Sequence, residues 1–287
     1  MMYVNMRFPE GKAKCVTFSY DDARKSDIRL SDMLQKYGIK CTFNITGKGF
    51  RSDDTHLTHS EIEKYIIDRG HEIAVHGYCH RGTGGLRPIE GIRDVFDNRT
   101  EPEKEFGMII RGMAYPDSGI HYFPNPDYSY EKVKKYLNEL DIAYARTICR
   151  DNNDFKMPVD WYDWRPTAHH NNEKVFDWID EFLNIDISEN VYIANRSSRL
   201  FYLWGHSFEF DSNNNWERGE EICKKIGGRP EIWYATNIEI YDYVKAFNSL
   251  IYSADGNIIY NPTLTDVWID IDKKVYEIKS GETLHLK

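Results

Sequence analysis

The sequence predicts an α/β protein whose repeated strand–helix units approach a complete barrel. Short segments rich in β-branched and aromatic residues alternate with longer segments of helical period, from residue 14 to about residue 250. The chain of 287 residues is long enough for one large domain with a single core. Its content of 41% hydrophobic and 29% charged residues is typical of a packed fold rather than of a disordered chain.

The first strand–helix unit follows from its boundary residues. Residues 14–20 form an apolar segment typical of a buried strand. Ser26 is in position to cap the following helix, which Gly38 ends. Residues 39–45 are then expected to form the second strand.

The second unit carries stronger helix signals. Thr58 and Glu61 have the spacing of a capping box, and Gly70 stops the helix that they begin. Residues 71–75 predict the next strand, and Pro88 opens a further helix. The remaining units continue the alternation, with strands expected at 108–114, 142–148, 199–205 and 231–235 and helices at 129–140, 173–183, 216–226 and 238–249.

The pattern changes after about residue 250. The last segment alternates apolar and polar residues, carries DG and SG turn signals and lacks a helical period. We therefore expect a catalytic barrel at residues 1–250 and a small β-strand appendage at residues 251–287. No Gly/Ser-rich linker separates the two parts, so the appendage is expected to pack on the barrel.

Composition and charge restrict the partners. The formal net charge of −9 gives no basic surface for phosphate backbones, which argues against nucleic acid. The 20 Tyr and 7 Trp would suit a carbohydrate cleft, although most such rings are expected in the core. The sequence shows no signal peptide and no apolar run of membrane-spanning length, so we expect a cytoplasmic protein with no membrane span. Five cysteines without CxxC spacing are expected to be free thiols.

Three segments place polar residues at the ends of predicted strands, where βα barrels collect catalytic groups. Asp21 and Asp22 follow the first strand, although an Asp pair alone is more often a solvated cap in a loop. His76 and His80 follow another strand, and on one helical turn their spacing would place both imidazoles on the same side. Two histidines and a carboxylate form a metal site with positions left open for water and substrate. His206 ends a third strand and is suited to protonate a leaving amine.

These segments together resemble the polysaccharide deacetylase family, the carbohydrate esterases with a NodB homology domain. The resemblance covers roughly residues 14–206 and rests on SYDDA at 19–23, KCTFNI at 40–45, GHEIAVHGYCH at 70–80 and LWGH at 203–206. It implies a distorted (β/α)7 barrel and a divalent ion, usually zinc, bound by Asp22, His76 and His80. It also implies that Asp21 is the general base and His206 the general acid.

The chain departs from the family pattern at two places. Ala114 stands where the family has an arginine that orients the base, and we predict that Arg165 replaces it, with Arg111 as second candidate. In the same alignment Asp117 is expected to donate its backbone N–H to the oxyanion. Gly77 stands where the family usually has Ser or Thr, so one bond that supports the metal-ligand loop is expected to be lost.

Three functions are compatible with these residues. The first is a metal-dependent hydrolase that removes N-acetyl groups from a sugar or polysaccharide. The second is a cyclic-amide or ureide hydrolase that resembles allantoinase-like members of the same superfamily. The third is a sugar-binding protein with a degenerate site, against which the complete set of acidic and histidine residues argues. His169 and His170 are expected to have a structural or substrate-lining role.

Overall fold

The computed structural model describes residues 2–50, 54–117, 119–148 and 155–286. Its centre is a curved sheet of parallel strands in the order β6-β5-β4-β3-β2-β8-β7, and β9 also pairs with β2. The order confirms the predicted distorted (β/α)7 barrel. These strands are β2 (Lys14–Asp21), β3 (Cys41–Ile45), β4 (Glu72–Val75), β5 (Gly112–Ala114), β6 (Tyr144–Arg146), β7 (Ala168–His169), β8 (Arg199–Gly205) and β9 (Ile232–Tyr234).

The barrel is open between β6 and β7, the two ends of the strand order. An isolated parallel bridge joins Arg146 to Trp164 at this gap, shortly before β7 begins at Ala168. Trp164 is buried and packs edge-on against Tyr144 and Tyr202. Side-chain packing therefore continues across the gap where the hydrogen-bonded ladder stops.

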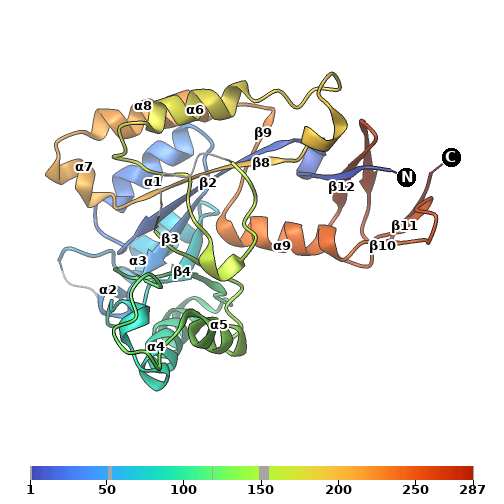
Figure 1. Cartoon of the computed structure of the whole chain (residues 1–287). Coiled ribbons are helices and arrows are strands. Elements are labelled where there is room, and N and C mark those ends of the chain that lie inside the picture. Colours follow the sequence, from blue (N-terminus) through green and yellow to red (C-terminus); the bar gives the residue numbers. More distant parts are fainter. Residues whose placement is uncertain (1, 51–53, 118, 149–154, 287) are drawn as a thin grey trace.

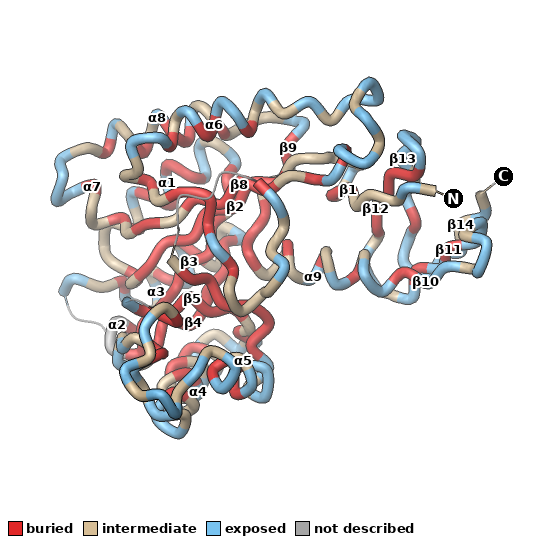
Figure 2. The backbone as a smooth tube through the Cα atoms, in the orientation of Figure 1, coloured by how far each residue is buried: buried red, intermediate tan, exposed pale blue. Residues whose placement is uncertain are grey.

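Helices cover both sides of the strands (Figure 1). Helices α6 and α8 run along one side, and α4 and α5 pack together at the opposite side. Both faces of β2 and β3 are buried, which explains their nearly continuous apolar sequence (Figure 2). The helices are α1 (Asp27–Lys36), α2 (Gly47–Phe50), α3 (His59–Ile62), α4 (Pro88–Phe106), α5 (Tyr130–Glu139), α6 (Val175–Asn184), α7 (Phe208–Ser212), α8 (Trp216–Ile226) and α9 (Asn237–Asn248).

The predicted helix starts have different outcomes. The capping box of Thr58 and Glu61 is confirmed at the start of α3, and Pro88 begins α4. The predicted cap at Ser26 is wrong, because its side chain makes no cap bond and its hydroxyl lies 2.7 Å from that of Ser207. The hydroxyl of Ser26 therefore contacts Ser207, a residue distant in the sequence, and does not cap the helix.

The C-terminal segment forms two small antiparallel sheets. β10 (Ile251–Tyr252), β11 (Ile258–Tyr260) and β14 (Thr283–His285) form one, and β12 (Val267–Ile271) and β13 (Lys274–Ile278) form the other with β1 (Val4–Arg7). The N-terminal strand thus belongs to an appendage sheet, although we predicted residues 1–250 as the barrel. Apolar residues of these strands pack on Ala246 and Leu250, at the end of α9. The domain division itself stays a proposal.

A buried ion cluster joins β1 to β12. Asp270 is fully buried and accepts hydrogen bonds from the guanidinium groups of Arg7 and Arg196. Both arginines are at most 6% exposed, so the cluster is shielded from water.

None of the helices in the described ranges is long and apolar enough to cross a membrane.

Asp270→Ala is expected to destabilise the protein by about 3–5 kcal/mol, because two guanidinium groups would remain buried without their carboxylate. Urea unfolding measures this loss. Glu277→Ala removes an exposed carboxylate of β13 in the same sheet and is expected to cost less than about 1 kcal/mol. Equal losses in the two variants would contradict the argument from burial.

Candidate active site

The carboxyl end of β2 supplies the first two acidic residues. Asp21 is the last residue of the strand and is 2% exposed, and Asp22 follows with φ +82°. The N–H of Asp22 donates to the backbone oxygen of Asn44 at 2.9 Å, so the end of β3 holds this turn. A non-glycine residue in the left-handed region is strained, and such strain is typical of functional sites.

Asp22, His76 and His80 come together as predicted. Oδ1 of Asp22 lies 3.9 Å from Nε2 of His76 and 3.7 Å from Nε2 of His80. The ligand atoms of the three side chains all lie within 4.8 Å of one another. Nδ1 of His76 lies 2.9 Å from the backbone oxygen of Ala114 and donates to it, which leaves the Nε2 lone pair for a metal. This donor set fits a divalent ion such as zinc.

The route by which the two histidines meet differs from the prediction. They do not share a helical turn, because β4 ends at Val75 and the next residues are irregular. Gly77 at φ +72° and His80 at φ +50° instead fold the loop back. A four-residue spacing therefore produced the expected contact through a different backbone conformation.

Asp21 is held by a cation and an amide. Arg146 donates to Oδ1 and Oδ2 of Asp21 at 2.8 and 2.6 Å, and Asn44 donates to Oδ1 at 2.7 Å. Burial by itself would raise the pKa of Asp21, but the charge of Arg146, followed by His76 and His206, lowers it to about 2. Asp21 is therefore a carboxylate at any pH at which the protein would be assayed.

The predicted contact between Arg165 and Asp21 is wrong. Arg165 pairs with Asp163 at 2.6 Å, and the second candidate, Arg111, pairs with Asp242 at 2.5 Å. The sequence analysis missed Arg146, which lies inside the strand predicted at 142–148 and is the last residue of the observed β6. It is the direct partner of Ala114 across the β5–β6 pair, so the guanidinium comes from the neighbouring strand.

His206 follows β8 and faces the same carboxylate. Its Nε2 lies 3.7 Å from Oδ2 of Asp21, and its Nδ1 lies 2.8 Å from Oε1 of Glu209, to which it donates. Burial lowers the pKa of His206, but the bond to Glu209 and the charge of Asp21 outweigh it, so that the pKa is raised. Glu209 lies in α7, a short helix that the sequence analysis missed.

A second group of potential ligands surrounds Glu209. Its Oε2 lies 3.4 Å from Nε2 of His169, 3.0 Å from Nε2 of His170 and 2.7 Å from Nδ2 of Asn171. Nδ1 of His169 accepts the N–H of Asn171 at 3.1 Å, so in the neutral ring Nε2 carries the proton. Because that nitrogen has no free lone pair, the group fits a hydrogen-bonded cluster around Glu209 better than a second metal site.

Asp117 lies beside the candidate metal ligands. Its Oδ1 is 3.7 Å from Nδ1 of His80, on the side of the ring away from Asp22, and its φ is +49°. The predicted use of its backbone N–H stays a prediction. The carboxylate instead gives His80 an acidic neighbour, as metal-ligating histidines commonly have.

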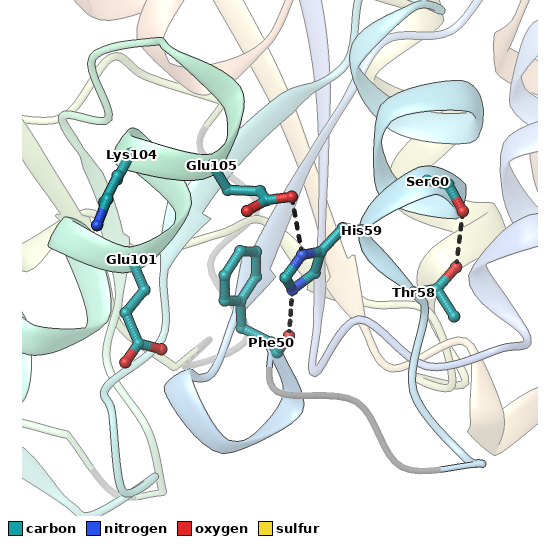
Figure 3. Close-up of a pocket in the computed structure, with 7 residues that line it drawn as sticks. All are labelled: Phe50, Thr58, His59, Ser60, Glu101, Lys104 and Glu105. Atoms are coloured by element: carbon teal, nitrogen blue, oxygen red, sulfur yellow. Dashed lines mark hydrogen bonds and ion pairs between the residues drawn. The ribbon is translucent and has the colours of Figure 1, made fainter.

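The cavity shown in Figure 3 contains none of these residues. It has a volume of about 800 Å³ and lies between α2, α3 and α4. His59 stacks on Phe50, and its two nitrogens lie near the Phe50 oxygen and Glu105, at 2.8 and 3.1 Å. With both nitrogens engaged, His59 has a structural role and does not mark a catalytic centre.

Comparisons with known proteins agree on one family. Residues 9–144 match the family model described as polysaccharide deacetylase. A protein of Mycobacterium smegmatis assigned to the polysaccharide deacetylases is 16% identical, with a TM-score of 0.54 over 86% of this chain and 96% of that one. At this identity the match shows a shared fold. None of the curated proteins matches the chain.

Two other solved structures have lower scores. A mutant form of the peptidoglycan deacetylase PdaC from Bacillus subtilis is 18% identical over 84% of this chain and 95% of its own, with a TM-score of 0.47. BA3943 of Bacillus anthracis, a CE4 family pseudoenzyme, is 13% identical over 83% of this chain and 68% of its own, with a TM-score of 0.48.

Proposed function

Residues 9–144 belong to the polysaccharide deacetylase family, and from that premise we propose that the protein is a metal-dependent hydrolase that removes N-acetyl groups from a sugar or polysaccharide. It would act on a carbon–nitrogen bond that is not a peptide bond. The observation that carries the proposal is the close approach of a set of potential metal ligands and a pair of potential acid–base residues. Asp22, His76 and His80 form a ligand set, and Asp21 and His206 lie directly beside it.

Zinc is the ion that we propose for Asp22, His76 and His80. Two imidazole nitrogens and one carboxylate are typical of catalytic zinc sites, which keep further positions open. Bound there, zinc would polarise the acetyl carbonyl and lower the pKa of a water molecule.

Asp21 is suited to accept the proton of the attacking water. Its carboxylate is ionised, and its Oδ2 is 3.8 Å from Nε2 of His76, so the base lies next to the proposed metal without being one of the three ligands. Arg146 fixes its orientation through two hydrogen bonds. A low pKa makes Asp21 a weak base, so its contribution depends on position more than on basicity.

His206 is suited to protonate the departing nitrogen. Its Nδ1–H donates a hydrogen bond to Glu209, and its Nε2 lies on the side of Asp21. The raised pKa keeps a larger fraction of the ring protonated near neutral pH. We also propose that the backbone N–H of Asp117 stabilises the oxyanion, since the residue lies beside His80.

The test is acetate release from a panel of N-acetylated sugars, with zinc content measured in parallel. We expect about one zinc ion per chain and acetate release only from the zinc-loaded protein, because three ligands suffice for a catalytic site. Asp22→Ala, His76→Ala and His80→Ala are each expected to lose the bound zinc and the release of acetate. Ring opening of cyclic ureides without acetate release would favour the allantoinase-like alternative, and sugar binding without turnover would favour the degenerate site.

A further inference from the structure

Helix α4 holds the loop between the two proposed histidine ligands at two residues one helical turn apart. Oδ1 of Asn98 accepts the N–H of His76 at 3.0 Å. Asp94 accepts two further hydrogen bonds from the loop. Its backbone oxygen accepts the N–H of Tyr78 at 3.1 Å, and its Oδ1 accepts the N–H of Cys79 at 2.8 Å. Because residues four apart share one side of a helix, α4 presents a continuous edge of acceptors to this loop.

Asp94 also fills the space beside Gly77. A Cβ atom on residue 77 would lie 2.6 Å from Oδ2 of Asp94 and 3.0 Å from Cγ of Pro116. Residue 77 has φ +72°, a conformation that L side chains rarely adopt. Thus a side chain at residue 77 has no room, and the carboxylate of Asp94 from α4 occupies that space.

We propose that Asp94 is a positioning residue for the candidate metal centre and supplies the loop support that residue 77 lacks. The inference rests on the proposed function, because it assigns the loop a metal to bind. His80 directly follows Cys79, so the bond from the Cys79 N–H to Asp94 fixes the backbone from which the second histidine projects. Groups that orient metal ligands in this way tune metal affinity.

Zinc affinity of the full-length protein, measured by competition with a chromophoric chelator, tests this role. Asp94→Ala is expected to weaken zinc binding by about 10–100-fold. Asp94→Asn keeps an oxygen that can accept the Cys79 N–H and is expected to stay within about threefold of wild type. Asp97→Ala is the matched control, since it removes a half-exposed carboxylate of the same helix that lies 3.9 Å from Arg93.

Two outcomes of this titration overturn the proposal. One is an Asp94→Ala variant that binds zinc as tightly as wild type. The other is an Asp97→Ala variant that loses as much affinity as Asp94→Ala, because the effect would then come from charge and not from the bond. Gly77→Ala adds a further check, since it should weaken zinc binding less in the Asp94→Ala background, where the new methyl group no longer meets the carboxylate.

Amide hydrogen exchange on the metal-free protein separates this inference from the proposed function. Asp94→Ala is expected to accelerate exchange of the Cys79 amide, while Asp97→Ala leaves it unchanged. Unchanged exchange in Asp94→Ala overturns the loop support whether or not zinc binds. A wild-type chain that takes up no zinc rejects the proposed metal centre, and the exchange rate then decides the loop support by itself.

Discussion

Asp21→Asn is expected to lower the rate of acetate release by about 10²–10⁴-fold, the usual contribution of a general base, while zinc stays bound. The amide has the shape of the carboxylate but cannot take a proton at neutral pH. Asp21 is not one of the three proposed ligands, so metal content should not fall. Turnover per bound zinc measures the effect, and a variant with a near-normal rate would remove Asp21 from the chemistry.

The pair Arg146→Met and Arg165→Met tests what holds the base. Loss of Arg146 removes two hydrogen bonds and the main charge that lowers the pKa of Asp21. A carboxylate whose depressed pKa rises must lose its proton at higher pH, so the acid limb of the rate profile should move toward neutral pH. Arg165 pairs with Asp163 instead, and its variant is expected to keep the wild-type profile. The opposite result would restore the original assignment of Arg165.

The strand-end argument predicted most of the candidate site. Residues at the carboxyl ends of parallel strands meet at one edge of the barrel, so Asp21, His76 and His206 could be placed together without knowing a single contact. The distances of 3.8 and 3.7 Å from Oδ2 of Asp21 to the two histidine rings agree with that placement. This placement was possible because the strands that carry these residues are long or strongly apolar and can therefore be predicted from the sequence.

The same argument does not identify Arg146, because the order of motifs along the chain does not show which strands pair. Motif order indicates Arg111, near Ala114, and Arg165, on the next motif. In the sheet, the residue directly beside Ala114 is Arg146 on the neighbouring strand β6. The two residues are far apart in the sequence. Strand order is a tertiary property, and the local pattern of a three-residue strand does not reveal its neighbour.

The N-terminal strand shows a similar limit. β1 pairs with β12, and the bond between Arg7 and Asp270 spans 263 residues. Nothing within residues 1–10 indicates whether this strand joins the barrel or the appendage, since both need apolar residues. Only the placement of a carboxylate partner near the other end of the chain decides it.

Glu209 was missed for a different reason. α7 covers five residues, Phe208–Ser212, which is too short for a helical period to appear in the sequence. The useful signal was the spacing of His206 and Glu209, because residues three apart can meet on one helical turn. The carboxylate that orients the proposed acid thus lies in the segment directly after it.

His206→Ala is expected to lower turnover by about 10²–10³-fold and to remove the alkaline limb of the rate profile, because the departing nitrogen then lacks its proton donor. Substrates with strongly basic leaving amines should slow more than those with weakly basic ones. Zinc content is expected to stay near that of wild type, since His206 is not among the proposed ligands. Steady-state rates on matched substrates, from about pH 5 to about pH 10, measure both effects.

Glu209→Gln keeps His206 but removes the neighbouring negative charge that helps to raise its pKa. Glu209 helps to raise the pKa of His206, so without the negative charge that pKa falls and the protonated ring is lost at lower pH. The alkaline limb should therefore move toward acid pH, whereas Glu217→Gln, which removes an exposed carboxylate of α8, should leave it in place. Since the two limbs belong to a coupled pair of groups, histidine NMR is needed to follow His206 itself. If His206→Ala slows good and poor leaving amines equally and the limb persists, the acid is another group, and His169 on the far side of Glu209 is the next residue to replace.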